Sequence, residues 1–139
     1  MPGCDYYIPE QSLIIEFDER QHFSIPRKIT LEMYPEGIEL GFNHKKHLNL
    51  CEDIKAGDKD KDVPHRDEQR AWLDTLRDFI PLIFELKPTI RVIWRDFNWR
   101  ELDPDNHAHI EAFRRLLNYN LCFNLCFIDE LDVKNPVLF

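Results

Sequence analysis

Apolar residues recur along the chain in short runs, and their spacing predicts strands and helices in succession. Two short strands are expected near the N-terminus, over residues 6–9 and 13–17, with Glu10-Gln11-Ser12 between them. Pro9 is expected to end the first strand, because proline has no backbone N–H to donate to a neighbouring strand. The two strands together predict a β-hairpin.

The middle of the chain has a weaker pattern. Residues 24–43 show no regular period and contain two prolines and two glycines. We therefore expect an extended segment there, with a short strand at 38–40. Residues 44–54 are compatible with a short helix. The run 55–62 mixes charges of both signs and has no large apolar residue, which predicts an exposed loop.

The second half predicts helix, strand, helix and a last apolar segment. A long helix is expected to begin near His65, because apolar residues follow at helical spacing. Pro81 is expected to kink or divide this helix. The β-branched run at 89–94 predicts a strand. Asp103-Pro104 is a typical helix start, with Asp as the cap and proline in the first turn. Residues 121–128 are expected to form a final buried strand or apolar tail.

Composition narrows the class of protein. The length and the order of elements predict a single mixed α/β domain over residues 1–139. The absence of a long apolar run and of a secretory signal predicts a cytoplasmic protein without a membrane helix. The net charge of −8 argues against general binding to polyanions. A local basic face and a carboxylate-bound cation could still accommodate nucleic acid.

Three acids border the predicted hairpin. With Glu10 and Gln11 as its turn, Asp5 lies opposite Glu16, and directly opposed side chains have Cβ atoms about 4.5–5.5 Å apart. Asp18 follows two residues later and points from the same face of the strand. Carboxylates that converge in this way either raise one pKa or require a counter-cation, and hard oxygen ligands suit Mg²⁺ or Mn²⁺. The hairpin therefore predicts a metal site.

Two alternatives remain open at this point. The turn lacks the Asn-Gly or Asp-Gly of a tight hairpin, and a register shift of one residue would separate the acids. In the simpler interpretation, Glu16 lies on the solvated face of a one-sided antiparallel sheet, and the residues from Asp18 onward are the polar end of a strand.

The order Asp5, Glu16-x-Asp18, Gln21-His22 resembles the PD-(D/E)xK restriction-endonuclease-like superfamily, and within it the branch near the very-short-patch repair endonucleases. The resemblance implies an α/β core with a mixed central sheet flanked by helices. It implies that Asp5 and Glu16 bind the metal and that Asp18 is a third ligand or orients water at the position of the family lysine. It also implies that His22, or the more weakly matching Gln21, positions the attacking water.

The chain departs from the family pattern at several points. Position 18 is Asp where the family has Lys, so a substitute cation must come from elsewhere. Glu19 stands where the branch usually has Gly. Only four residues precede Asp5, whereas the family core begins with a helix and a strand, so the resemblance implies a fragment or a trimmed descendant. The candidates for the substitute cation and for contacts to a phosphate are Arg27, Lys28, Arg66 and Arg70.

Two functions of different classes follow. The first is Mg²⁺- or Mn²⁺-assisted hydrolysis of phosphodiester bonds in nucleic acid, with DNA as the expected substrate. The second is a small acidic interaction protein, such as an immunity protein, an antitoxin or an accessory subunit, on an inactive nuclease-like scaffold. The net charge and the missing lysine favour it. A third hypothesis keeps the nuclease but completes its sheet with a homodimer partner or a separate segment.

The remaining polar and aromatic residues have simpler interpretations. The basic residues of 44–47 are expected at the surface. Trp72 and Trp94 are expected to pack against each other. The arginines and aspartates of 66–78 are expected to form an exposed helix face with ion pairs. The four cysteines have no zinc-like spacing, which favours small core residues.

Overall fold

The computed structural model describes residues 3–56 and 64–121, and the side chains as far as residue 117. The strands in these ranges are β1 (Tyr6–Ile8), β2 (Leu13–Asp18) and β3 (Ile90–Ile93), and the helices are α1 (Ile25–Glu32), α2 (His44–Ile54), α3 (Arg66–Phe84) and α4 (His107–Leu121). Single 3₁₀ turns lie at Pro9–Gln11, Arg20–His22 and Trp99–Glu101. The predicted mixed α/β class is confirmed at this level.

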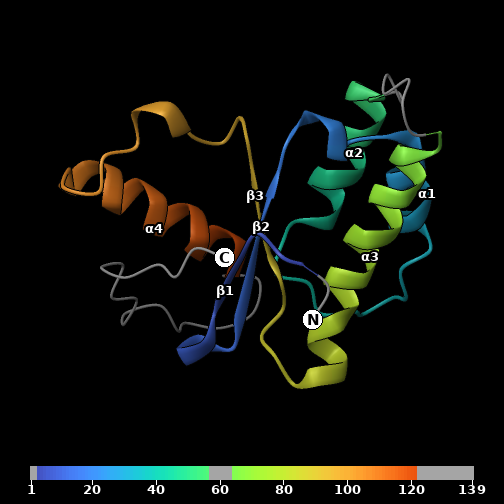
Figure 1. Ribbon diagram of the computed structural model, residues 1–139, viewed down its shortest axis with the longest axis horizontal. Helices are drawn as coiled ribbons and strands as arrows, with labels where there is room; N and C mark the ends of the chain where they lie inside the picture. The colour runs from blue at the N-terminus through green and yellow to red at the C-terminus, as the bar shows by residue number, and fades with distance from the viewer. Residues whose placement is uncertain (1–2, 57–63, 122–139) are drawn as a thin grey trace.

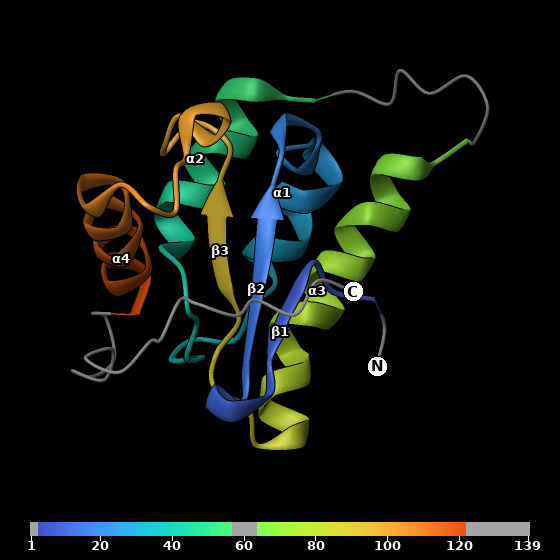
Figure 2. The same cartoon turned by 60° about the vertical axis from the view of Figure 1, so that its left-hand side comes forward.

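The sheet is mixed, with the strand order β1-β2-β3. β1 is antiparallel to β2, and Tyr6 lies opposite Ile15, which is the register expected from the sequence. β3 runs parallel to β2 and places Arg91 opposite Glu16. The carboxyl ends of β2 and β3 therefore lie at the same edge of the sheet (Figure 2). Open α/β sheets commonly bind ligands outside such ends.

Helices cover both faces of the sheet. α4 packs on one face, and α1, α2 and α3 form a layer on the other (Figure 1). The core on the α4 side contains Leu13, Ile15, Ile90, Val92 and Leu117. The core on the other side contains Phe23, Leu31, Phe42, Leu50, Cys51 and Ile93. Because side chains alternate along a strand, Glu16 and Asp18 point into the layer beneath α1, α2 and α3.

The extended segment expected over residues 24–43 is wrong, because its first part is α1. Ser24 caps this helix, and its Oγ accepts a hydrogen bond from the backbone N–H of Arg27 at 3.3 Å. Pro26 lies in the first turn, where its missing N–H costs no helical hydrogen bond. A proline that counted against regular structure is thus part of a helix start.

The two later helices compare differently with the prediction. α3 begins at Arg66, near His65 as expected, and Pro81 does not divide it. α4 begins at His107 rather than at Asp103, and the Oδ1 of Asn106 accepts the backbone N–H of Ala108 at 3.0 Å. Both Asp and Asn are good cap residues, so composition alone did not distinguish the two positions.

Other predictions are confirmed or lie outside the described ranges. α2 has the predicted bounds, and β3 lies within the predicted strand. Trp72 and Trp94 do not pack together, since Trp72 is 60% exposed and Trp94 contacts Phe23 with ring centroids 5.5 Å apart. Cys51 is buried in the core. Most of the predicted loop at 55–62 and the apolar run after Leu121 lie outside the described residues. No helix in the described ranges is long and apolar enough to span a membrane.

The strand expected at 38–40 is replaced by one backbone bridge between Gly41 and Ile90. A Cβ at position 41 would lie 2.6 Å from the carbonyl oxygen of Thr89 and 2.7 Å from that of Pro88. We therefore expect Gly41→Ala to lower the free energy of unfolding by about 1–3 kcal/mol, the usual cost of overpacking. Urea unfolding measures this loss. Gly3→Ala is the control, because a Cβ there meets no atom within 4 Å, and equal effects of the two substitutions would contradict the prediction.

Candidate functional site

The acids of β2 do not face solvent. Glu16 and Asp18 are each 2% exposed, and they lie on the sheet face that α1, α2 and α3 cover. The interpretation of Glu16 as a solvated residue of a one-sided sheet is therefore wrong, because the sheet is covered on both sides. Instead, both acids are next to Arg91 of β3, which is 1% exposed.

Arg91 is the centre of a buried charged cluster. Its Nη1 donates to Asp18 Oδ1 at 2.6 Å, and its Nε donates to Asp78 Oδ1 at 2.7 Å. Its Nη2 donates to the backbone oxygen of Asp74 at 3.0 Å. The guanidinium has five N–H donors in a rigid plane, so it can hold several fixed acceptors at once. Arg91 thereby links β2 to two successive turns of α3.

Residues of α1 and α2, and Tyr34 just after α1, complete this cluster. Arg27 Nη2 donates to Asp78 Oδ2 at 2.6 Å, and the hydroxyl of Tyr34 donates to the same oxygen at 2.6 Å. His47 Nε2 lies 3.1 Å from Asp18 Oδ2. In the described part of the chain, every buried side-chain nitrogen and oxygen has a partner. A fully satisfied polar network of this kind makes a core rigid.

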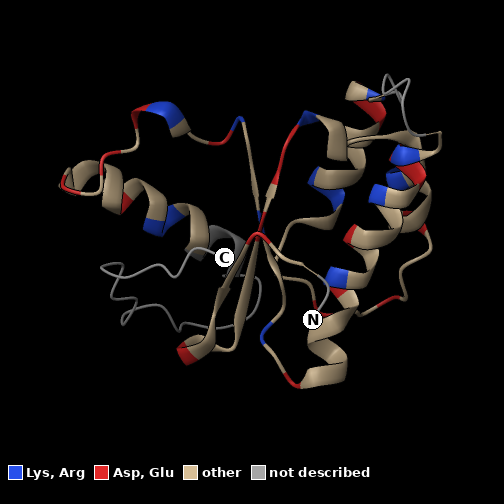
Figure 3. Cartoon of the chain, viewed as in Figure 1, with Lys and Arg blue, Asp and Glu red and all other residues tan. Residues whose placement is uncertain are grey.

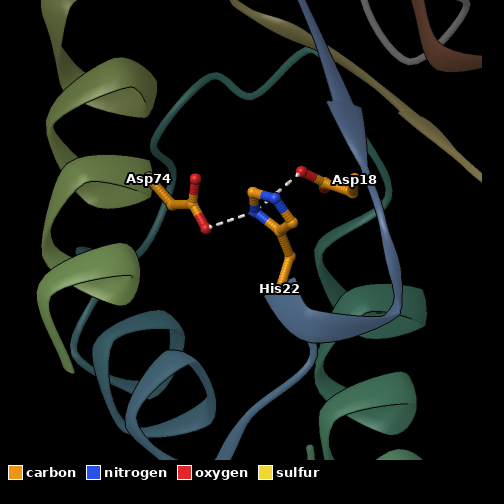
Figure 4. A group of neighbouring side chains, drawn as sticks. All are labelled: Asp18, His22 and Asp74. Carbon is orange, nitrogen blue, oxygen red and sulfur yellow. Dashed lines mark hydrogen bonds and ion pairs between the residues drawn. The ribbon is translucent and has the colours of Figure 1, made fainter. Parts of the chain in front are cut away.

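His22 joins the cluster from its outer side. Its Nδ1 lies 2.9 Å from Asp74 Oδ2 and 3.6 Å from Asp18 Oδ1 (Figure 4). The side chain of His22 is 16% exposed, whereas the two acids are buried. Within the described ranges, this is the one group of three or more His, Cys, Asp or Glu side chains whose ligand atoms all lie within 4.8 Å of one another.

The three acids expected as metal ligands are arranged differently. Asp5 and Glu16 are neighbours across the hairpin, because Glu16 Oε1 accepts the backbone N–H of Asp5 at 3.3 Å. Asp5 Oδ2 accepts the backbone N–H of Phe17 at 2.8 Å, and Glu16 Oε1 lies 3.3 Å from Arg77 Nε. Asp5 and Glu16 therefore do not belong to the group of ligand atoms that includes Asp18.

Burial and neighbouring charges set the protonation of the two buried strand acids. Burial raises the pKa of Glu16 to about 7, although Arg91 and Arg77 oppose the rise. Burial would also raise the pKa of Asp18, but Arg91 and the hydrogen bond with His47 hold it below its usual range. Asp18 is therefore ionised at neutral pH, whereas Glu16 exchanges its proton near neutrality.

The pKa of His22 is also raised, but by its charged neighbours and against the effect of burial. Burial would lower its pKa, but the hydrogen bond and the charge of Asp74 raise it above its ordinary value, and Asp18 adds to the rise. The carboxyl of Asp74 has a lowered pKa, because Arg91 and His22 outweigh its burial. The pair is thus an imidazole held by a carboxylate, which is the arrangement that orients a histidine for proton transfer.

The donor atoms of Asp18, His22 and Asp74 fit a divalent cation in kind and in spacing. Two carboxylate oxygens and one imidazole nitrogen suit Mn²⁺ better than Mg²⁺, which prefers oxygen ligands alone. The imidazole must lose its Nδ1 proton before that nitrogen can bind a metal. Metal binding at this group therefore competes with the hydrogen bond between His22 and Asp74.

Comparison with known proteins gives no independent identification. No protein-family model, curated protein or solved structure matches the chain.

Three of the four cations expected at a phosphate lie away from the Asp18–His22–Asp74 group or beneath the surface. Arg27 is 3% exposed and bound within the cluster. Lys28 faces α2, with its Nζ 2.9 Å from Glu52. Arg66 is exposed at the first residue of α3.

Arg70 is the cation that lies beside this group. Its Nη1 donates to the backbone oxygen of Gln21 at 3.2 Å, and Gln21 immediately precedes His22. The side-chain amide of Gln21 is exposed and donates to Glu19 at 2.6 Å. Gln21, His22 and Arg70 are therefore brought together by the turn after β2, as the sequence predicted for the first two.

The roles of Asp74, Asp78 and Arg91 are not among the predictions from the sequence. Residues 66–78 were expected to form an exposed face, but Asp74 and Asp78 are buried. Their spacing from the apolar Ala71 is three and seven residues, which places them on its side of the helix. Arg91 interrupts an apolar strand, and a charge at such a position requires a buried acidic partner. Both signals could have indicated the cluster.

Proposed function

We propose that the protein is a divalent-cation-dependent phosphodiesterase that acts on nucleic acid, on an α/β core of restriction-endonuclease-like type. The observation that carries the proposal is the Asp18–His22–Asp74 group beside the carboxyl ends of β2 and β3. Ligand sites are frequent outside the carboxyl ends of parallel strands. The sequence pattern that contains Glu16, Asp18 and His22 supports the same class of reaction.

In this proposal, Asp18, His22 and Asp74 would hold the cation, which would supply Lewis-acid polarisation of a phosphoryl oxygen and a lower pKa for a bound water. Glu16 has a pKa of about 7, and a group with a pKa near the working pH is an efficient general base. Arg77 links Glu16 to the cation group, because its Nε lies 3.3 Å from Glu16 Oε1 and its Nη1 lies 3.3 Å from Asp74 Oδ1.

Exposed groups beside His22 are suited to the phosphate itself. Arg70 and Gln21 both carry N–H donors, and guanidinium groups bind phosphate oxygens in pairs. Their hydrogen bond to each other fixes the turn after β2 against α3. We assign them to substrate positioning.

The charge balance of the cluster favours a second candidate, an interaction protein on an inactive scaffold. The two oxygens of Asp18 are already held by Arg91 and His47. The two oxygens of Asp74 are held by His22 and Arg77. A buried guanidinium in contact with the acids supplies the counter-charge that would otherwise require a metal ion. The two candidates therefore differ in whether a cation can enter.

A cation titration separates them. If the cation binds, Mn²⁺ is expected to stabilise the folded protein by about 2.7 kcal/mol at a free concentration of 100 times Kd, with a corresponding rise in Tm. His22→Gln is expected to abolish this rise, because it removes one ligand and leaves the buried acids paired with Arg91. His107→Gln is the control, since His107 is exposed on α4 and should leave the rise unchanged.

Cleavage is tested on single-stranded and duplex DNA and RNA with Mn²⁺ and with Mg²⁺. We expect the wild-type chain and His107→Gln to cleave and His22→Gln to lose activity. If neither Mn²⁺ nor Mg²⁺ raises Tm and no substrate is cut, the nuclease proposal falls and the interaction protein remains.

A further inference from the structure

Two hollows lie where β2 and β3 end. The first has a volume of about 350 Å³ and is lined by Asn43, Lys45, Lys46, Asn49, Asp53 and Arg95. The second has a volume of about 360 Å³ and is lined by Phe17, Glu19, Arg20, Gln21 and Trp94. Each is within the size range of small-ligand pockets. Arg95 lines the first hollow and Trp94 the second, and we call this pair of consecutive residues the border.

The border has the chemistry of a nucleotide contact. Trp94 is partly exposed, and its inner side packs on Phe23 of the core. The guanidinium carbon of Arg95 lies 5.8 Å from the centre of the Trp94 ring. An aromatic ring beside a cation can stack on a base while the cation contacts the neighbouring phosphate. The core contact with Phe23 holds the indole in place without a ligand.

The charge around the hollows is locally positive, although the chain as a whole is acidic. In the described part of the chain, Lys45, Arg95 and Arg20 form no ion pair with a carboxylate. Lys46 is held by Asp96, with Nζ–Oδ2 at 2.8 Å. Figure 3 shows basic segments at the ends of both strands and at the start of α2, with acidic segments beside them. Local fields of this kind bind phosphates even when the net charge is negative.

We propose that the two hollows form one path for a single-stranded nucleic acid, with Trp94 as the stacking surface and Lys45, Arg95 and Arg20 as phosphate contacts. The second hollow is lined by Gln21, which immediately precedes His22, so the path reaches the turn that carries His22. The inference rests on the proposed function, since it names the form of the substrate. A single strand is favoured over a duplex because Trp94 requires an unpaired base.

Binding is measured by fluorescence anisotropy of a labelled oligonucleotide in EDTA, so that hydrolysis plays no part. We expect the single strand to bind more tightly than the duplex of the same sequence. Lys45→Gln with Arg95→Gln is expected to reduce the slope of log K against log salt by about 1.4, because each phosphate contact on a single strand contributes about 0.7. Arg100→Gln with Arg115→Gln is the matched control, since both arginines are exposed beyond β3 on the side of α4.

Stacking is tested by Trp94→Leu, which is expected to weaken single-strand binding about tenfold. Circular dichroism checks that this variant folds, and the glutamine pair tests the path independently if it does not. Equal affinity for the duplex, or equal slopes for the two glutamine pairs, would overturn the path. If the wild type binds the single strand but does not cleave it, the proposed hydrolysis is overturned and the path stands. If the wild type cleaves and the path variants have no effect, the path is overturned and the proposed hydrolysis stands.

Discussion

Replacing Arg91 by methionine is expected to lower the free energy of unfolding by about 3–5 kcal/mol, the usual cost of removing one partner from a buried ion pair. Methionine fills much of the same volume but leaves Asp18 and Asp78 without their shared cation. Both acids are almost fully buried, so water cannot replace the guanidinium. Because whole domains are stable by about 5–15 kcal/mol, this is a large fraction of the total. Urea unfolding followed by circular dichroism measures the loss.

Two variants separate the charge of Arg91 from its geometry. Arg91→Lys keeps the positive charge but loses the rigid fork, so an intermediate loss is expected. If the methionine variant does not fold, the loss of stability is measured on Arg91→Lys instead. Arg100→Met is the control for the exposed surface, where substitutions usually change stability by less than about 0.5 kcal/mol. A loss of less than about 1 kcal/mol for Arg91→Met would show that the cluster contributes little to stability.

The cluster also has to behave as a unit. Asp18→Asn is expected to destabilise the chain, because the amide keeps its shape but loses its charge beside Arg91. In the double variant Asp18→Asn with Arg91→Met, the combined loss is expected to be smaller than the sum of the single losses. The reason is that both single substitutions lose the same contact between Asp18 and Arg91, so the double variant loses it only once. An additive result would show that the two side chains act independently.

The hairpin could be predicted from the sequence because its determinants are local. Placing Glu10 and Gln11 at the turn between two short apolar strands determines which residues lie opposite each other. The opposition of Tyr6 and Ile15, and with it the proximity of Asp5 and Glu16, followed from that rule. The exact bounds of α2 could be predicted for the same reason, since Asn43 caps it and its apolar residues have helical spacing.

The charged cluster could not be assembled from the sequence, because its parts are far apart along the chain. Asp18, Asp74 and Arg91 meet only when α3 packs over β2 and β3. Four of the 26 Asp and Glu residues lie in the core beside arginines, so the net charge of −8 does not describe the surface alone. Asp5, Glu16 and Asp18 were expected to form one metal site, but they lie in two neighbouring groups. Arg77 holds Glu16 in one, and Arg91 holds Asp18 in the other.

Stability should also depend on pH through Glu16, and this is the second large effect. Burial raises the pKa of Glu16 from 4.5 to about 7 in the folded chain. The folded state therefore binds a proton that the unfolded state has lost between these two values, so stability falls as pH rises from about 4.5 to about 7. A shift of this size corresponds to about 3 kcal/mol. Urea unfolding at pH 4.5, 6 and 8 measures the fall.

Glu16→Gln tests the assignment, because the amide cannot ionise. The difference in free energy of unfolding between this variant and the wild type should change by about 3 kcal/mol from pH 4.5 to pH 8, in favour of the variant at pH 8. The exposed Glu36→Gln is the matched control. The pKa of His22 is also raised in the folded chain, so its contribution to stability also falls as pH rises, but at higher pH. This contribution is fully present below about 6.5 and is lost as pH rises through the folded pKa. Parallel curves for the wild type and Glu16→Gln would mean that Arg77 and Arg91 keep Glu16 ionised. Glu16 would then be a fixed charge of the cluster and could not accept a proton in the proposed reaction.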